Sequence, residues 1–435
     1  MITFISKRRS EAEASKSRCP LNLRFATQKC RVTMATFIQT LASMSQQLAL
    51  VSDPKNTIPF SPQKDLPKRL VPPHVEALKP YQPGRPPVEL LKELGMERFI
   101  NMASNENPLG PPQSALDAIQ KALPQINRYP DLCGTNLREA LAERFATKID
   151  NIALGSGSES TMANIIRAFL HEDDEVLTSQ GTFIGLYVLV NAQGIKLNTV
   201  PLKNYHFDLD GIAAAVNPKT KMIYLCNPNN PTGTIFNRTE FENFIRKIPD
   251  HVLVILDEAY YEFAAINPEY PDSMRYRLDN VLTLRTFAKA YGMAGIRLGY
   301  GLGHEYLIDY VNRIKLPFEP NLLAQEAGLA ALQDDEFLNR TLENNEEGMA
   351  YLTGELDKLG LQRIPSHSNF IMIEMGSQEK VAKIHDGLLR NGIAIRPLAG
   401  FGLPTCWRIS IGQPAENKLL ITALKKIMQP EQSKK

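Results

Sequence analysis

The sequence lacks most of the features that mark a membrane-spanning, disulfide-stabilised or nucleic-acid-binding protein. Its 435 residues contain five scattered cysteines and no CxxC pair, which argues against a disulfide framework or a zinc site and favours a reducing compartment. No apolar run reaches the ~20 residues that cross a bilayer, and we find no internal repeat. Because the net charge is only +2, nothing predicts nucleic acid as a partner. We expect a globular protein of the cytoplasm.

The N-terminal segment differs from the rest of the chain in charge and pattern. Its first 35 residues hold eight basic and two acidic residues, a composition typical of an organelle transit peptide. A disordered extension, or translation from too early a start with Met34 and Met44 downstream, is the favoured explanation. We predict that residues 1–70 are a disordered extension. Residues 71–105 then form an arm, and its proline-rich part, 71–88, should run extended because a residue before proline avoids helix.

The central part of the chain alternates short apolar runs with helical patterns. The run Val252–Leu256 is apolar at every position, which is typical of a parallel strand buried on both faces. Such alternation predicts an α/β large domain, residues 106–303, with a mostly parallel sheet flanked by helices. After residue 304 a long helical pattern, Asp335–Leu359, is followed by short strand-like runs. We therefore expect a smaller α+β domain at residues 304–430.

Two chemically useful side chains follow predicted strands. Asp257 comes directly after the run Val252–Leu256, and Lys289 follows the run Val281–Leu284 closely. Ligands of open α/β sheets gather at the carboxyl ends of the strands. A lysine removed from water there would have a lowered pKa and would attack an aldehyde. A strand-end turn aspartate and a surface lysine remain the alternatives.

Three further features suit an anionic ligand. Arg297 lies between glycines, and a guanidinium grips phosphate through two hydrogen bonds. The Gly/Ser turn at 155–160 leads into a helical pattern, so its N–H groups could face a phosphate. The segment NPNNPTG at 227–233 is a rigid turn that could aim the amide of Asn230 into a site. A structural ion pair and plain turns are the alternatives.

The order of three segments brings these features together. The segments NPNNPTG at 227–233, DEAYYEF at 257–263 and TFAKAYGMAGIRLGY at 286–300 resemble those of the fold-type I aminotransferases of class I/II. Within that class the chain resembles the histidinol-phosphate aminotransferases, over roughly residues 75–428. The resemblance implies the fold of the pyridoxal-phosphate (PLP) transferases, PLP as cofactor, a small-molecule amino donor and keto acceptor as substrates, and a homodimer.

The resemblance also implies roles for individual residues. Lys289 matches the lysine that binds the cofactor covalently and then shuttles a proton, and Asp257 matches the acid that keeps the pyridine nitrogen protonated. Asn230 and Tyr260 match the pair that hydrogen-bonds the cofactor's 3′ oxygen. The other implied cofactor contacts are phosphate binding by Arg297 and by the N–H groups of Ser158 and Glu159, ring stacking by Phe183, and a phosphate contact made by Tyr129 across the dimer.

For the substrate, Arg408 resembles the arginine that binds an α-carboxylate. Arg396 and Tyr81 resemble residues near the distal phosphate of histidinol phosphate, although an interdomain salt bridge would also explain Arg396. One departure from the class is Ala288, where serine or threonine commonly contacts the cofactor phosphate. The missing hydrogen bond is worth roughly 0.5–1.5 kcal/mol, or up to ~3 kcal/mol with a charged acceptor.

The implied reaction is transfer of an amino group from histidinol phosphate to 2-oxoglutarate, giving imidazole-acetol phosphate and glutamate, a step of histidine biosynthesis. The alternatives are an aromatic amino-acid aminotransferase, a phosphothreonine-decarboxylase-like lyase and, from another functional class, a PLP-binding module without turnover. The intact set of Lys289, Asp257 and Arg297 favours an enzyme over such a module.

Overall fold

The computed structural model describes residues 70–78 and 99–428, together with positions 39, 42, 43, 92, 93 and 95. By its internal contacts the chain divides into residues 1–70 and residues 71–435. Almost all of the first unit, for which the sequence predicts disorder, lies outside the described residues. Tyr81, an expected substrate residue, lies outside them as well.

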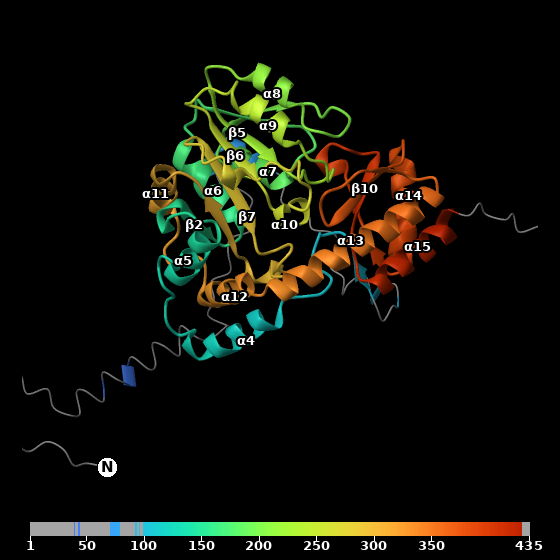
Figure 1. The fold of residues 1–435 in the computed structure, drawn as a ribbon, viewed down its shortest axis with the longest axis horizontal. Coiled ribbons are helices and arrows are strands. Elements are labelled where there is room, and N and C mark those ends of the chain that lie inside the picture. The colour runs from blue at the N-terminus through green and yellow to red at the C-terminus, as the bar shows by residue number, and fades with distance from the viewer. Residues whose placement is uncertain are drawn as a thin grey trace, which may run out of the picture. The chain divides into compact units, whose positions relative to one another are not determined.

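A seven-stranded sheet forms the centre of the larger domain (Figure 1). Its strand order is β2-β8-β7-β6-β5-β3-β4, and only β8 runs antiparallel to its neighbours. The strands are β2 (Ile152–Gly155), β3 (Glu175–Ser179), β4 (Lys196–Val200), β5 (Thr220–Cys226), β6 (Leu253–Asp257), β7 (Val281–Thr286) and β8 (Gly299–Leu302). Every residue of β6 and β7 is buried, as expected for parallel strands covered on both faces. The predicted α/β class with a mostly parallel sheet is confirmed.

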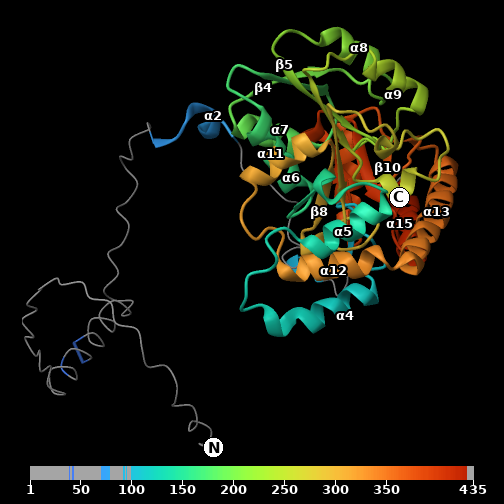
Figure 2. The same cartoon turned by 60° about the vertical axis from the view of Figure 1, so that its left-hand side comes forward.

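Helices cover this sheet. Helix α6 packs on β2, β7 and β8, and α7 packs on β4. Helix α12 lies along α4 (Figures 1 and 2). The helices of this part are α4 (Gln113–Ala122), α5 (Thr135–Arg144), α6 (Ser158–Phe169), α7 (Ile184–Ala192), α8 (Leu209–Ala215), α9 (Arg238–Ile245), α10 (Tyr261–Ala264), α11 (Glu305–Ile314) and α12 (Leu322–Leu332).

A short helix interrupts the proline-rich segment. Residues 73–76 form α2 (Pro73–Glu76), so the prediction of an extended chain over 71–88 is wrong there. Pro72 itself is extended, with φ −60° and ψ 144°. Pro73 takes the first helical position, where its missing N–H group leaves no hydrogen bond unmade. Residues 79–88 lie outside the described part.

The C-terminal elements build a second, smaller core. An antiparallel sheet of order β12-β13-β10-β9 packs with α13, α14 and α15 (Figure 1). Its elements are α13 (Asp335–Lys358), β9 (Gln362–Ile364), β10 (Phe370–Glu374), α14 (Gln378–Arg390), β12 (Arg396–Pro397), β13 (Cys406–Ser410) and α15 (Pro414–Met428). The arm joins this core, because β1 (Ile100–Asn101) pairs with β11 (Ile393–Ala394) and Met102 is buried in it. The predicted smaller α+β domain is confirmed.

The packing assigns α11 and α12 to the large domain. Helix α11 packs on α6 and β2, and Ala324, Ala327 and Ala331 of α12 share a core cluster with Leu137 and Leu154. Since the sequence predicts a small domain that begins at residue 304, we propose instead that the division falls within α13. Helical spacing shows that a helix has an apolar face, but it does not tell which sheet that face covers.

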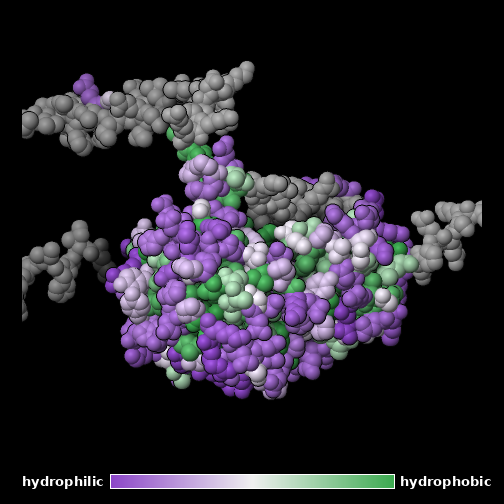
Figure 3. All heavy atoms as spheres, turned by 90° about the horizontal axis from the view of Figure 1, so that it is seen from above, coloured by the Kyte–Doolittle hydropathy of each residue, from purple (hydrophilic) through white to green (hydrophobic). Residues whose placement is uncertain are grey.

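Within the described part of the chain, no helix is both long enough and apolar enough to cross a membrane. On the face drawn in Figure 3 the surface is mostly hydrophilic, with smaller hydrophobic areas between.

Candidate active site

A cavity of about 180 Å³ opens at the carboxyl ends of β5, β6 and β7. Its place agrees with the rule that open α/β sheets bind ligands at that edge. Eight residues that the resemblance assigns to the cofactor line it: Ser158, Glu159, Phe183, Asn230, Asp257, Tyr260, Lys289 and Arg297. The others are Gly157, Cys226, Ala259, Thr286 and Ala288. Side chains from distant parts of the chain therefore meet where the sequence predicted a site.

Lys289 lies in the turn that follows β7. The N–H group of Ala288 donates to Oγ1 of Thr286 at 3.1 Å, which fixes the turn, and Nζ of Lys289 donates to the carbonyl of Ser104 at 3.3 Å. Burial, and after it the positive charge of Arg408, lower the pKa of Lys289 to about 8. The unprotonated amine, which a nucleophile requires, is therefore far more populated near neutral pH than in an ordinary lysine.

Asp257 ends strand β6 with its side chain buried. Its Oδ2 accepts a hydrogen bond from the hydroxyl of Tyr224 at 2.6 Å, and its Oδ1 accepts one from the N–H group of Ala259 at 3.1 Å. Burial raises the pKa of the Asp257 carboxyl to about 6, against the opposing effect of the Tyr224 hydrogen bond. A cation in the cavity would offset this burial cost and hold the carboxylate ionised.

Groups that suit an anion gather where helix α6 begins. The helix has no side-chain cap, so its first N–H groups, at Ser158 and Glu159, keep the dipole that attracts anions. At Gly157, where φ is +87°, an added Cβ would lie 2.7 Å from Nη2 of Arg297. Glycine thus lets the guanidinium approach the helix N-terminus, and together they suit a phosphate.

Arg408 connects the small domain to the cavity. Its side chain is buried and donates to Oδ1 of Asn230 and, at 2.9 Å, to the carbonyl of Ala103. The guanidinium carbon also lies 5.1 Å from the centre of the Phe370 ring. Arg408 is therefore held beside Asn230, at the edge of the cavity.

Arg396 lies next to Arg408 but does not line the cavity. The two residues face each other across the antiparallel pair β12–β13, and both guanidinium carbons lie 6.0 Å from the ring of Phe401. No ion pair joins Arg396 to any residue that the structure describes, so the interdomain salt bridge considered from the sequence is not seen.

Tyr129 lies outside the cavity of its own chain. It is 79% exposed, and its ring stacks on Phe318 with centroids 4.2 Å apart. The structure therefore brings together the expected cofactor residues of one chain, and leaves Tyr129 on the surface.

One loop that contacts three of these residues was not predicted from the sequence. The carbonyl of Ala103 accepts from Arg408, the carbonyl of Ser104 accepts from Lys289, and the side chain of Asn105 donates to Tyr260 at 2.9 Å. The signal available was a polar stretch, NMASNENP, between a strand and a helix. Asparagine is common in such loops because it tolerates left-handed backbone.

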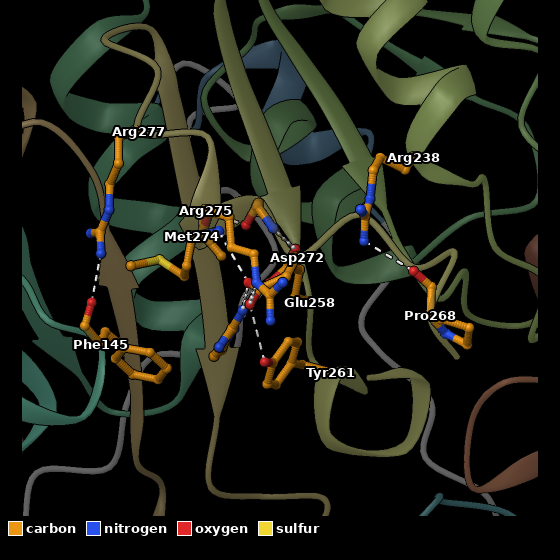
Figure 4. Close-up of polar contacts among 12 residues, drawn as sticks. Phe145, Arg238, Glu258, Tyr261, Pro268, Asp272, Met274, Arg275 and Arg277 are labelled. Carbon is orange, nitrogen blue, oxygen red and sulfur yellow. Dashed lines mark hydrogen bonds and ion pairs between the residues drawn. The ribbon is translucent and has the colours of Figure 1, made fainter. Parts of the chain in front are cut away.

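A buried charge cluster, also not foreseen, supports the strand ends. Nη2 of Arg285 donates to Glu258 at 2.7 Å and to Asp272 at 2.8 Å. The guanidinium carbon lies 3.3 Å from the centre of the Tyr261 ring. Figure 4 shows Glu258 and Asp272 converging beside Tyr261. Since Glu258 follows Asp257 directly, the cluster fixes the backbone on which the cavity carboxylate stands.

This fold and this set of side chains define a class of proteins. Residues 97–424 match the family model described as aminotransferase class I and II. Because that match spans well over half of the chain, the chain belongs to this family, and it is a PLP-dependent transaminase with the fold-type I architecture.

Within the family the chain is similar to several histidinol-phosphate aminotransferases. It is 42% identical over 359 residues to histidinol-phosphate aminotransferase 1 of Idiomarina loihiensis, covering 82% of this chain and 97% of the relative. It is 42% identical over 356 residues to the protein of that name from Mannheimia succiniciproducens, covering 81% and 96%. The crystal structure of histidinol-phosphate aminotransferase from Sinorhizobium meliloti, in complex with pyridoxal 5′-phosphate, is 30% identical with a TM-score of 0.77, covering 84% and 98%.

Proposed function

We propose that this chain is a histidinol-phosphate aminotransferase, which exchanges an amino group between histidinol phosphate and 2-oxoglutarate. The observation that carries the proposal is the cavity itself, which joins a lysine of lowered pKa, a buried carboxylate and an anion site. The relatives that match nearly their whole length support the choice of substrate.

The residues of the cavity fit pyridoxal 5′-phosphate, the cofactor of this family. Arg297 and the N-terminus of α6 would bind its phosphate, Asp257 would pair with its ring nitrogen, and Phe183 would cover its ring. Gly157 supports this fit, since a side chain there would fill the space beside Arg297. When bound, PLP supplies a carbonyl group for the incoming amine and a ring that accepts electrons from the substrate's Cα.

The chain's own residues would then handle protons and charge. With its pKa lowered to about 8, Lys289 can release a proton to, and take one from, a group beside it near neutral pH. Asp257, paired with a cation, stays ionised and holds that positive charge in place. Tyr260 and Asn230 supply polar groups at the cavity wall, and these would bind an oxygen of the cofactor.

The two arginines of the small domain would divide the recognition of two substrates. Glutamate has an α-carboxylate that Arg408 would bind, whereas histidinol phosphate has none and carries a phosphate instead. In that half-reaction Arg408 would face the phosphate with Arg396 and Tyr81. The proximity of Arg396 and Arg408 across β12–β13 supports this use of one site for both substrates.

We also propose that the enzyme is a homodimer in which Tyr129 contacts the cofactor phosphate in the other subunit's site. The surface around Tyr129 supports this, because large apolar side chains are exposed there, including Ile126 at 63%, Leu132 at 49% and Leu316 at 60%. Exposed apolar patches of this kind mark contact surfaces. Cytoplasmic location, or import directed by the basic N-terminal segment, stays a prediction.

A substrate panel on purified holoenzyme tests the proposed reaction. Histidinol phosphate, phenylalanine and tyrosine are compared as amino donors to 2-oxoglutarate, with glutamate as the measured product. We expect the highest kcat/KM with histidinol phosphate. Higher kcat/KM with the aromatic amino acids would identify an aromatic aminotransferase, and release of CO₂ from phosphothreonine without formation of glutamate would identify a lyase.

A further inference from the structure

Asn105 occupies an unusual place between the two domains. Its side chain is 1% exposed, and its backbone is left-handed, with φ +55°. A residue with a Cβ pays a conformational cost there, which asparagine bears better than most. Such a conformation persists where the surroundings hold it firmly, often beside a functional site.

Hydrogen bonds to the small domain fix which way the Asn105 amide points. Its backbone N–H group donates to Oγ of Ser410 at 2.8 Å, and the Ser410 hydroxyl donates to Oδ1 of Asn105 at 3.2 Å. The carbonyl of Asn105 accepts from Nδ2 of Asn369 at 3.1 Å. Since no other acceptor for the Ser410 proton is found among the described residues, the end of the amide that faces Ser410 is assigned as Oδ1 and the other end as the NH₂ group.

That NH₂ group meets Tyr260. Nδ2 of Asn105 donates to the Tyr260 hydroxyl at 2.9 Å, and both side chains are buried. An amide NH₂ group can only donate, so the phenol oxygen accepts here and its own proton turns elsewhere. Tyr260 lines the cavity with Lys289 and Asp257, and among the described residues no hydrogen-bond acceptor for its O–H group is found.

We infer that Asn105 is a positioning residue, which makes the Tyr260 hydroxyl a hydrogen-bond donor directed into the cavity. There the hydroxyl stabilises a negatively charged oxygen of the bound cofactor. This inference rests on the proposed function, and it assigns the polarity of the Tyr260 hydrogen bond. The same network ties Tyr260 to β13, the strand that carries Arg408.

The substitution Asn105→Asp reverses the direction of this hydrogen bond. A carboxylate accepts the phenol proton and withdraws it from the cavity, while aspartate still tolerates the left-handed backbone. The readout is a pH titration of the visible absorbance of the holoenzyme without substrate. We expect the pKa of that absorbance to rise by about one to two units, the effect of losing one hydrogen bond to a charged oxygen.

Three companion variants separate this role from a merely structural one. Glycine in Asn105→Gly tolerates φ +55° and removes the hydrogen bond to Tyr260, so this variant should raise the absorbance pKa by less than Asn105→Asp does. If the aspartate variant does not fold, Asn105→Gly provides the test. Asn417→Asp is the matched control, a buried amide of the small domain that bonds the backbone of Gly412; its titration should equal that of the wild type. Tyr260→Phe removes the hydroxyl itself.

A double variant decides whether Asn105 acts through Tyr260. We expect Tyr260→Phe to raise the absorbance pKa, and Asn105→Gly to add nothing in that background. The inference on Asn105 alone is overturned if Tyr260→Phe shifts the absorbance pKa while Asn105→Asp and Asn105→Gly leave it unchanged. It is also overturned if the shift in the double variant equals the sum of the shifts caused by Tyr260→Phe and Asn105→Gly. If no visible band forms, the proposed function fails. If Tyr260→Phe titrates like the wild type, the role of Tyr260 and the inference on Asn105 fail together.

Discussion

Ala288 is the one departure from the class pattern that the resemblance of the sequence indicates. Its side chain lines the cavity, beside Lys289, where a hydroxyl would reach the cofactor phosphate. The nearby hydroxyl of Thr286 donates to the carbonyl of Leu298 at 3.3 Å, so its proton is already in use. The side chain at position 288 therefore offers a bound phosphate no hydrogen-bond donor.

The substitution Ala288→Ser should tighten cofactor binding. One added hydrogen bond to a charged acceptor lowers the dissociation constant of PLP by about tenfold. The measurement is absorbance titration of the apoenzyme with PLP, with Ala290→Ser as a control, since Ala290 is buried but does not line the cavity. An unchanged or weaker affinity in Ala288→Ser would show that the phosphate lies elsewhere.

Arg396 should distinguish the two substrates. Removing its charge by Arg396→Ala is expected to raise KM for histidinol phosphate about tenfold to a hundredfold, because a charged hydrogen bond to phosphate is lost. KM for glutamate should change little, since Arg408 would bind the carboxylate. Steady-state kinetics of both half-reactions check this, and an equal rise in both KM values argues against a distal-phosphate role.

At the scale of elements, helix α10 holds a buried acid that no described cation neutralises. Glu262 is 8% exposed, and Arg285, one of the cations that act on it, pairs with Glu258 and Asp272 instead. Burial raises the pKa of Glu262 from 4.5 to about 7. Between those values the folded state holds a proton that the unfolded chain has lost, so stability falls as pH rises from about 4.5 to about 7.

The substitution Glu262→Gln should remove that pH dependence. The buried Glu262 carboxyl lowers the free energy of unfolding by about 3 kcal/mol as the pH rises between its unfolded and folded pKa values. The glutamine variant should therefore gain stability relative to the wild type as the pH rises. Thermal unfolding of the holoenzyme at about pH 5 and about pH 7.5 measures it, with the exposed Glu336→Gln as control. If the stability of the wild type and of Glu262→Gln changes equally with pH, the raised pKa is not that of Glu262.

The elements also show what a sequence can and cannot predict. Strands β6 and β7 and the start of α6 were predictable because each has a local pattern, and with them came Asp257, Lys289 and Ser158. Asn105 was not, because its contacts reach Tyr260 and Ser410, 155 and 305 residues away in the chain. A short polar loop has no periodicity from which such distant partners could be inferred.

At the scale of the whole molecule, a contact of Tyr129 across a dimer predicts complementation between two defective variants. Lys289→Ala should be inactive, and Tyr129→Ala should lose activity when PLP is limiting. After the two are unfolded together and refolded, half of the dimers are mixed, and each mixed dimer has one site with both residues intact.

Activity at limiting PLP should therefore return to about a quarter of the wild-type value. Each variant treated alone in the same way provides the control. No gain in activity on mixing would mean that Tyr129 acts within its own chain or not at all.

The central claim is that the amine of Lys289 forms the covalent link to the cofactor. Borohydride reduction of the holoenzyme makes that link permanent, and digestion followed by mass spectrometry locates it. We predict that the pyridoxyl mass lies on the peptide that contains Lys289 and on no other. A label on a different lysine, or no label on a protein that has been saturated with PLP, would contradict the account.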